Sequence, residues 1–222
     1  MARHRLRFKK ESRAIYLSHL DLMRTMQRVF VRAGVKIRHT EGFNPHPYIS
    51  VAMPLSVGVE SFTEFLDFEL VDDTPLLTLA ERLTENMPRG ITVLEAYPAE
   101  RKVKEIAWLG LAGTLEYDSA ADTAAMAQAL ALFFAQEGIP VKKMTKKKEE
   151  TEVDIAPLIR EITFTPLNPA AIALEATVAA QNPSLNPALL IEALRQRAEG
   201  LLPDFAAFSR REVYDKDMRV FR

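Results

Sequence analysis

Two histidines lie in the densest polar stretch of the chain, in surroundings suited to proton transfer. His19 occupies the first turn of a predicted helix, where the helix dipole favours neutral imidazole. His46 lies between Pro45 and Pro47, which restrict the backbone. With Asp21, Glu41 or Glu64 as an orienting carboxylate, the two imidazoles would support acid–base chemistry on RNA, or a weak metal site. Histidines in loop-rich regions also act as structural hydrogen-bond anchors, and this spacing matches no established metal or hydrolase motif.

The segment around His46 predicts a small motif pocket. We expect Glu41–Pro47 to form an ordered loop that packs near the start of the helix beginning at Ser18, with Phe43 buried. This arrangement would let His19 and His46 share one ligand. The residues expected to form the pocket are Ser18, Glu41, Gly42, Phe43, Asn44 and Glu64.

Cations are concentrated in the first fifty residues, which hold eleven Lys and Arg against three Asp and Glu. The next fifty hold two against ten. A local basic field attracts polyanions, and guanidinium groups suit phosphate oxygens. Three arginines spaced four residues apart form one stripe on the first predicted helix. The residues predicted to bind nucleic acid are Arg5, Arg7, Arg24, Arg28, Arg32, Lys36 and Arg38.

The same cations also have structural interpretations. The basic and acidic quarters of the chain could neutralise each other, with Arg5 and Arg7 as cross-strand partners of Asp67 and Glu69. The helical stripe could be an ordinary solvated face. A second basic run, Lys142–Lys148, is followed directly by glutamates and is typical of a hairpin tip.

Helix signals are clear along the chain. Capping boxes begin at Ser18 and Ser119, Thr74 and Pro75 predict another helix start, and Asn186-Pro187 predicts a fourth. Strands are predicted between the helices from alternating or apolar runs. They cover residues 4–9, 48–53, 63–70, 91–97, 108–116, 140–146, 160–165, 171–178 and 205–214.

This order predicts an α+β protein made of two tandem ferredoxin-like (βαββαβ) units, each an antiparallel sheet with its helices on one face. Residues 1–100 form the first unit and residues 101–222 the second. The second half contains one strand too many for a clean copy. Within residues 1–100, both helices should cover the same face of a four-stranded sheet.

Composition excludes several classes of function. The chain of 222 residues has no cysteine, which excludes disulfides, thiolate zinc sites and a self-held iron–sulfur cluster. We expect no metal site and no cofactor, because no Walker, Gly-rich phosphate or GxSxG pattern occurs. No apolar run is long enough to cross a bilayer, and the basic N-terminus lacks a signal-peptide core. We therefore expect a cytoplasmic protein without a membrane partner.

Three blocks within residues 4–70, YLSHLDLMR, EGFNPHP and ISVAMPLSVGVES, resemble the bacterial radical SAM-linked domain family, whose function is unknown. The later VDIAPLIR segment is similar to a further family feature. Members of that family occur alone or fused to a radical SAM enzyme, often encoded beside an E/G-type ribonuclease. The resemblance implies partnership with a radical SAM protein in modifying RNA or a ribosomal component. Without cysteines, this chain would be the accessory partner.

Three functional hypotheses follow. The first is an accessory RNA-binding or substrate-presenting protein that binds phosphates through its basic surface. The second is an RNA-processing or modifying enzyme that uses His19 and His46. The third is a protein–protein adaptor whose basic stripe binds an acidic partner.

Overall fold

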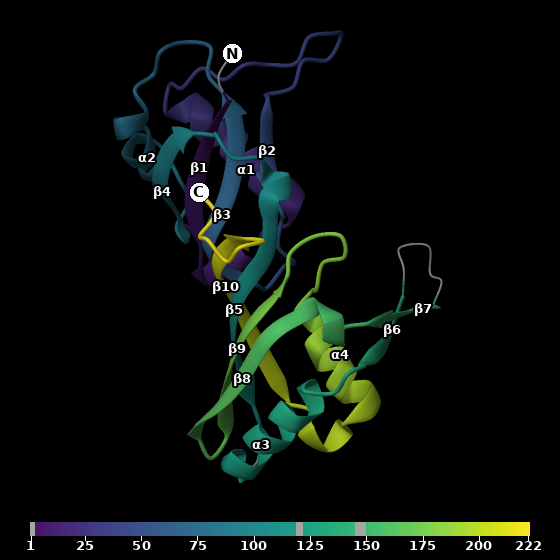
Figure 1. Ribbon diagram of the computed structural model, residues 1–222. Helices are drawn as coiled ribbons and strands as arrows, with labels where there is room; N and C mark the ends of the chain where they lie inside the picture. The colour runs from purple at the N-terminus through teal and green to yellow at the C-terminus, as the bar shows by residue number, and fades with distance from the viewer. Residues whose placement is uncertain (1–2, 119–121, 145–149) are drawn as a thin grey trace. The chain divides into compact units, whose positions relative to one another are not determined.

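The computed structural model describes residues 3–118, 122–144 and 150–222 (Figure 1). Within these residues the chain is a mixed α+β protein with mostly antiparallel strand pairing and four α-helices, so the predicted α+β class is confirmed. It divides into two compact units. Residues 1–105 and 221–222 form unit 1, and residues 106–220 form unit 2. The return of the last two residues to unit 1 was not anticipated from the sequence.

Unit 1 is a four-stranded antiparallel sheet with two helices. Its strands lie in the order β4-β1-β3-β2. The elements in chain order are β1 (Arg3–Lys10), α1 (His19–Arg32), β2 (Ile49–Ala52), β3 (Glu60–Glu69), α2 (Leu76–Glu85) and β4 (Ile91–Pro98). A short 3-10 helix, Ser12–Tyr16, connects β1 to α1.

The core of unit 1 lies between its helices and one face of its sheet. Leu6 and Phe8 of β1 are fully buried in the same cluster as Phe30 of α1 and Leu79 of α2. Because side chains alternate along a strand, Arg5 and its odd-numbered neighbours project from the other face. Both helices therefore cover one face of the sheet, as predicted for residues 1–100, and leave the other to the β1 arginines.

Unit 2 contains four antiparallel sheet strands, in the order β10-β5-β9-β8. Strands β6 and β7 pair only with each other, which accounts for the extra strand in the sequence. The elements are β5 (Ile106–Glu116), α3 (Thr123–Phe134), β6 (Pro140–Met144), β7 (Glu150–Asp154), β8 (Ile159–Asn168), β9 (Ala171–Ala179), α4 (Ala188–Arg197) and β10 (Phe205–Asp215). Most of the basic run Lys142–Lys148 lies outside the described residues.

Helix starts follow the sequence signals to within a few residues, although two of the predicted caps are wrong. The Ser18 hydroxyl accepts a hydrogen bond from the Asp21 N–H at 3.2 Å, as a capping box requires. Asp122 is itself the N-cap of α3 and accepts a hydrogen bond from the Ala125 N–H at 3.0 Å, so the cap predicted at Ser119, which lies outside the described residues, was placed too early. The expected Thr74 cap is wrong, because Thr74 donates its hydroxyl to Asp72 and Pro75 precedes α2. Among the described residues, no helix is both long and apolar enough to cross a membrane.

Candidate functional site

The start of α1 presents His19 to solvent and uses its neighbouring carboxylate in the cap. His19 is the first residue of the helix and is exposed. The Asp21 carboxylate accepts a hydrogen bond from the Ser18 hydroxyl at 2.7 Å and lies 3.5 Å from Arg24 Nη1. These contacts assign the Asp21 carboxylate to the helix cap. Among the described residues, no contact joins that carboxylate to His19.

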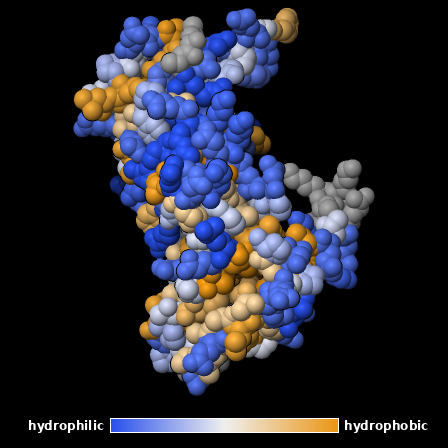
Figure 2. All heavy atoms as spheres, in the orientation of Figure 1, coloured by the Kyte–Doolittle hydropathy of each residue, from blue (hydrophilic) through white to orange (hydrophobic). Residues whose placement is uncertain are grey.

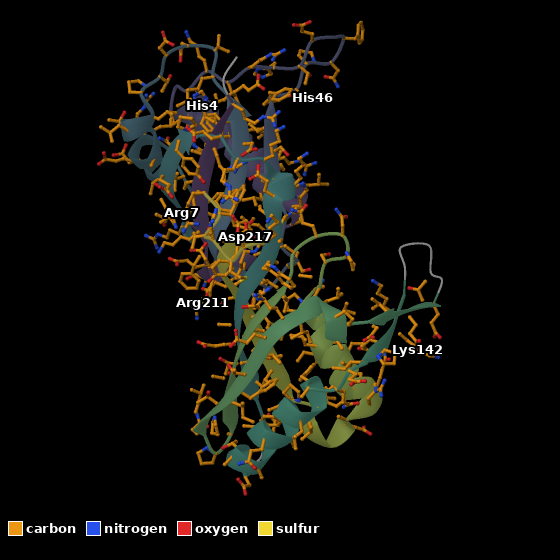
Figure 3. All side chains as sticks on the ribbon, viewed as in Figure 1. His4, Arg7, His46, Lys142, Arg211 and Asp217 are labelled. Carbon is orange, nitrogen blue, oxygen red and sulfur yellow. The ribbon has the colours of Figure 1, made fainter. Side chains whose placement is uncertain are left out.

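The segment between α1 and β2 forms a closed loop that projects from unit 1 (Figure 3). The Thr40 N–H donates to the His46 carbonyl at 2.8 Å, and the His46 N–H donates to Thr40 Oγ1 at 2.9 Å. The tip is exposed: Phe43 shows 109% relative exposure, so its predicted burial is wrong. Gly42 has a φ of 129°, a conformation that favours glycine. We call residues 40–46 the projecting loop.

His19 and His46 are held at opposite ends of the unit 1 sheet. The Gly58 N–H donates to the Ile15 carbonyl, which fixes the approach to α1 at the end where β3 begins. Ile37 pairs with Leu70, which fixes the stem of the projecting loop at the end where β3 finishes. The fourteen-residue helix between them spans about 20 Å. The structure therefore does not bring His19 and His46 to a common ligand.

The arginine stripe on α1 is exposed along its length. Arg24, Arg28 and Arg32 are all solvent-exposed, as is Lys36 just beyond the helix. Arg32 donates to the Asn86 carbonyl at 2.6 Å. In the described part of the chain the guanidinium of Arg28 has no ion pair or hydrogen bond. The α1 row, defined as these three arginines and Lys36, thus keeps its charge facing water.

Arg38 continues this basic surface at the stem of the projecting loop. Its Nη1 donates to Glu69 at 2.9 Å, and its guanidinium lies 5.5 Å from the centre of the Tyr48 ring. The hydrogen bond and the charge of Glu69 raise the pKa of Arg38 above its usual value. His39 and His46 are exposed beside it. Figure 2 shows that the surface over unit 1 in this view is predominantly hydrophilic.

Arg5 has a different environment, and its predicted role in nucleic-acid binding is wrong. It is 1% exposed and forms two hydrogen bonds to Asp67, at 2.6 and 3.0 Å. Its guanidinium also lies 4.9 Å from the centre of the Phe221 ring and 5.7 Å from that of Phe65. A buried bidentate pair under an aromatic lid cannot reach a phosphate from solvent. The cross-strand interpretation of Arg5 and Asp67 is confirmed.

The neighbours of Arg5 on this face are also engaged in structural contacts. Arg7 pairs with Glu95 of β4 at 2.5 Å, so its partner differs from the predicted β3 carboxylates. Tyr97 lies directly opposite Arg5 across the β1–β4 ladder, and burial raises the pKa of its hydroxyl to about 12. Glu64 is buried in the middle of β3 opposite Phe8, so it does not join the exposed projecting loop.

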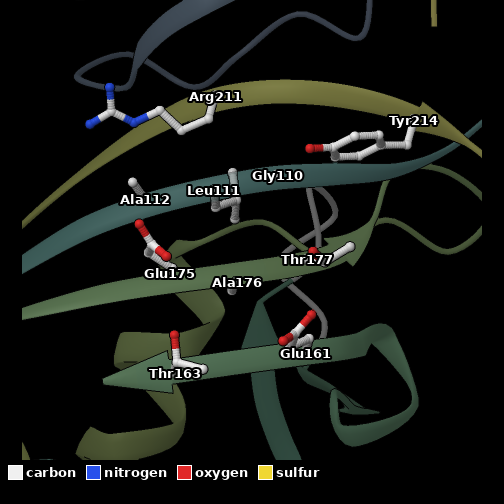
Figure 4. A pocket seen from close by; sticks show the side chains of 10 residues that line it. All are labelled: Gly110, Leu111, Ala112, Glu161, Thr163, Glu175, Ala176, Thr177, Arg211 and Tyr214. Atoms are coloured by element: carbon white, nitrogen blue, oxygen red, sulfur yellow. The ribbon is translucent and has the colours of Figure 1, made fainter. Parts of the chain in front are cut away.

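Sequence reasoning missed a recess on the face of the unit 2 sheet that carries Gly110 and Tyr214 (Figure 4). Its volume is about 270 Å³. The recess is lined by Gly110, Leu111, Ala112, Glu161, Thr163, Glu175, Ala176, Thr177, Arg211 and Tyr214. The signal in the sequence was the alternation in β5, where Trp108, Gly110 and Ala112 alternate with buried Leu109 and Leu111. That pattern indicates that one face of β5 is partly exposed and carries small side chains at Gly110 and Ala112.

Metal binding finds no support in the residues that the structure describes. They contain no cluster of three or more His, Asp or Glu side chains placed to hold an ion. The projecting loop and the start of α1 each supply one exposed histidine, at opposite ends of the sheet. What the geometry offers is an exposed basic surface in unit 1 and a polar recess in unit 2.

The family model described as "Uncharacterized protein conserved in bacteria (DUF2344)" matches residues 3–187. The chain belongs to this family. Its matched region contains α1, the projecting loop and β8 and β9, which carry part of the recess. Comparison with curated proteins finds no match.

Among solved structures, a chain in a crystal structure of a Cbf5–Nop10–Gar1 complex has a similar fold. The TM-score is 0.53 at 8% identity, and the match covers 95% of this chain and 48% of that chain. The DUF2344 chain thus spans about half of the matched chain, and the likeness concerns the fold alone. An unknown protein from Galdieria sulphuraria (TM-score 0.27, 10% identity, 94% and 98% coverage) and DyPB from Rhodococcus jostii RHA1 (0.22, 11%, 93% and 89%) have scores too low for structural argument.

Proposed function

We propose that this DUF2344 protein is an accessory RNA-binding protein that presents RNA or a ribosomal component to a radical SAM enzyme. The observation that carries the proposal is the exposed α1 row, whose charges face solvent, whereas Arg5 and Arg7 of β1 are paired with carboxylates of neighbouring strands. Phosphate contacts from Arg and Lys supply most sequence-independent affinity for nucleic acids. The radical SAM partnership is supported by the resemblance of the SHLD and GFNPHP blocks.

The projecting loop adds a second element suited to single-stranded RNA. It carries a fully exposed aromatic ring, Phe43, on a stem flanked by Lys36, Arg38 and His46. Proteins that bind single strands combine basic grooves with aromatic side chains on which bases stack. An acid–base enzyme using His19 and His46 is less well supported, because the two imidazoles lie at opposite ends of the sheet.

We propose further that each unit is a ferredoxin-like βαββαβ fold. The strand orders β4-β1-β3-β2 and β10-β5-β9-β8 support this, because both place the first and third strands in the centre. The β6–β7 hairpin would then be an insertion between the first helix and second strand of unit 2. On this interpretation the helices cover one face of each sheet, and in unit 2 the recess lies on the sheet face that carries Gly110 and Tyr214.

The test is a salt titration of affinity for a fluorescent single-stranded RNA, read by anisotropy. Four phosphate contacts from the α1 row predict a log–log slope of roughly −3, at about −0.7 per contact. Arg24→Ala together with Arg28→Ala should flatten the slope by between about one and two units. The matched control is Arg195→Ala with Arg197→Ala, two exposed arginines of α4, which should leave the slope unchanged.

The outcomes separate the hypotheses. If the α1 variant and wild type have the same slope, the row is a solvated face or an adaptor surface. Absence of RNA binding at low salt would overturn the RNA proposal and favour the protein–protein adaptor. Purification of the tagged protein from its native host, with mass spectrometry and RNA sequencing, tests the partnership. Recovery of RNA without any radical SAM protein would argue against the radical SAM partnership but would leave the RNA-binding proposal standing.

A further inference from the structure

The recess in unit 2 has a floor made by the smallest side chains of β5. Gly110 lies directly opposite Thr177, and Ala112 lies opposite Glu175, across the β5–β9 ladder. A Cβ atom on Gly110 would lie 3.3 Å from Cε2 of Tyr214. Glycine therefore lets the Tyr214 ring lie close to the β5 backbone, where it forms one wall (Figure 4).

The opposite side of the recess is a row of carboxylates and hydroxyls. Glu161 of β8 faces Thr177 of β9, and Thr163 faces Glu175, so carboxylates and hydroxyls alternate across the ladder. Figure 4 shows both carboxylates projecting from the same face of the sheet as Tyr214. An ionised carboxylate only accepts hydrogen bonds, so a ligand that binds Glu161 or Glu175 must supply donors.

Aromatic and cationic groups border the acceptors. Trp108 lies directly opposite Tyr214 across the β5–β10 ladder, and the Arg160 guanidinium lies 5.4 Å from the centre of the Trp108 ring. Arg211 lines the recess from β10. A cationic side chain from a protein partner would meet these two arginines as well as the glutamates. A neutral base on a phosphate backbone is attracted to the arginines and can still donate to the carboxylates.

We propose that this recess binds a guanine base of single-stranded RNA, an inference that rests on the proposed RNA-binding function and names its base preference. Guanine presents two adjacent donors on its Watson–Crick edge, the N1–H and the N2 amino group. Adenine, cytosine and uracil each present one donor beside an acceptor on that edge. A carboxylate of Glu161 or Glu175 accepts both guanine donors side by side. The volume of about 270 Å³ lies just below the usual range of small-molecule pockets and suits a single nucleotide.

The single tryptophan of the chain provides the readout, because a base stacking beside Trp108 quenches its fluorescence. Wild type is titrated with uridine-rich heptamers carrying one central guanosine, inosine or adenosine. Inosine lacks only the N2 amino group. We expect the guanosine heptamer to bind about tenfold more tightly than the inosine or adenosine heptamers, since a good bidentate contact discriminates by roughly that factor or more.

Variants locate the preference in the recess. Glu161→Gln and Glu175→Gln are each tested, and at least one should abolish the guanosine preference while leaving affinity for an all-uridine heptamer unchanged. Gly110→Ala should also reduce the preference, because the new methyl group displaces Tyr214. The control is Glu152→Gln on β7, a carboxylate outside the recess, which should keep the full preference.

Each alternative outcome is decisive. Equal affinity for all heptamers, with the expected salt dependence, overturns guanine recognition and leaves the RNA-binding function standing. If no heptamer binds, the proposed function fails, and guanosine monophosphate titrated alone then decides whether the recess recognises guanine. Stronger quenching by an arginine-containing peptide than by guanosine monophosphate would assign the recess to a protein partner and overturn the inference.

Discussion

Two rows of cations in unit 1 look alike in the sequence and differ in the structure. The β1 row (Arg5 and Arg7) is paired with Asp67 and Glu95 on the neighbouring strands. The α1 row, in contrast, lies along a solvent-facing helix, and its side-chain contacts in the described structure, Arg24 with Asp21 and Arg32 with the Asn86 carbonyl, are both exposed. The difference arises from the element that carries each row. A central strand places its residues between two neighbours, whereas an exposed helix face has none.

The comparison teaches that charge alone does not identify a binding surface. The excess of cations in residues 1–50 is partly cancelled by the acidic excess of residues 51–100, because β3 and β4 bring carboxylates beside β1. The cations that can still bind a polyanion are those that no carboxylate of a neighbouring strand neutralises. In unit 1 these cations are the α1 row, since Arg38 at the stem of the projecting loop pairs with Glu69 of β3.

The largest expected effect comes from breaking the buried pair of the β1 row. Arg5→Met leaves the Asp67 carboxylate buried without its partner, which should lower the free energy of unfolding by about 3–5 kcal/mol. Urea denaturation measures this loss. Arg28→Met, the matched change in the α1 row, should stay within about 0.5 kcal/mol of wild type.

The double variant Arg5→Met with Asp67→Leu sharpens this test. It removes both charges, so much of the lost stability should return if the single variant suffers from an unpaired carboxylate. Equal stability of the Arg5 and Arg28 variants would contradict the distinction between the two rows.

The sequence predicted local structure well and long-range pairing poorly. The Ser18 cap and the alternation of Leu6 and Phe8 are local signals, and both were correct. Arg5 was correctly matched with Asp67, but the partner of Arg7 is Glu95 of β4. Periodicity within β1 does not show which strand lies on its other side. Likewise, the pairing of β5 with β9 and with β10, which assembles the recess, joins residues from distant segments.

The projecting loop shows a related limit. Its prolines correctly indicated a defined turn, but the burial of Phe43 was inferred from hydrophobicity alone. Hydrophobicity favours burial only where a neighbouring surface is available. The stem of this loop is held at the end of β3 by the pairing of Ile37 with Leu70, and the tip that carries Phe43 projects beyond it into solvent. The expected pocket with Ser18 does not form, because the full length of α1 separates Ser18 from the projecting loop.

The second prediction tests whether this exposed ring belongs with the α1 row as a binding element. Phe43→Ala should weaken single-stranded RNA binding by about tenfold, the effect expected for loss of one stacked base. The salt slope should remain unchanged, because no phosphate contact is removed. Thermal unfolding should also be unaffected, since the ring is fully exposed. Anisotropy titration and calorimetry provide the two measurements.

Leu77→Ala on α2 is the control for that variant, because its side chain is 95% exposed and lies outside the loop. It should leave RNA affinity at the wild-type value. Unaltered affinity in Phe43→Ala would remove the loop from the interface and leave the α1 row as the binding element.

The smallest effect at neutral pH concerns Tyr97, which lies beside Arg5 in the β1–β4 ladder. Its hydroxyl is buried and has no hydrogen-bond partner among the described residues. Tyr97→Phe should therefore be neutral or stabilise the protein by up to about 1 kcal/mol at pH 7. This outcome would show that packing and the Arg5–Asp67 pair hold this face together without the hydroxyl.

Alkaline pH makes the same substitution more informative. Burial raises the pKa of Tyr97 to about 12, whereas a tyrosine in the unfolded chain ionises near 10. Between these values the unfolded state releases the proton first, so the free energy of unfolding should fall as pH rises from about 10 to 12. Below pH 10 this contribution is fully present. Tyr97→Phe should flatten that part of the pH profile, measured by urea unfolding, while Tyr16→Phe at an exposed position should not. Identical profiles for wild type and Tyr97→Phe would mean that water reaches the hydroxyl, and that the face of the sheet carrying Arg5 is more open than its contacts indicate.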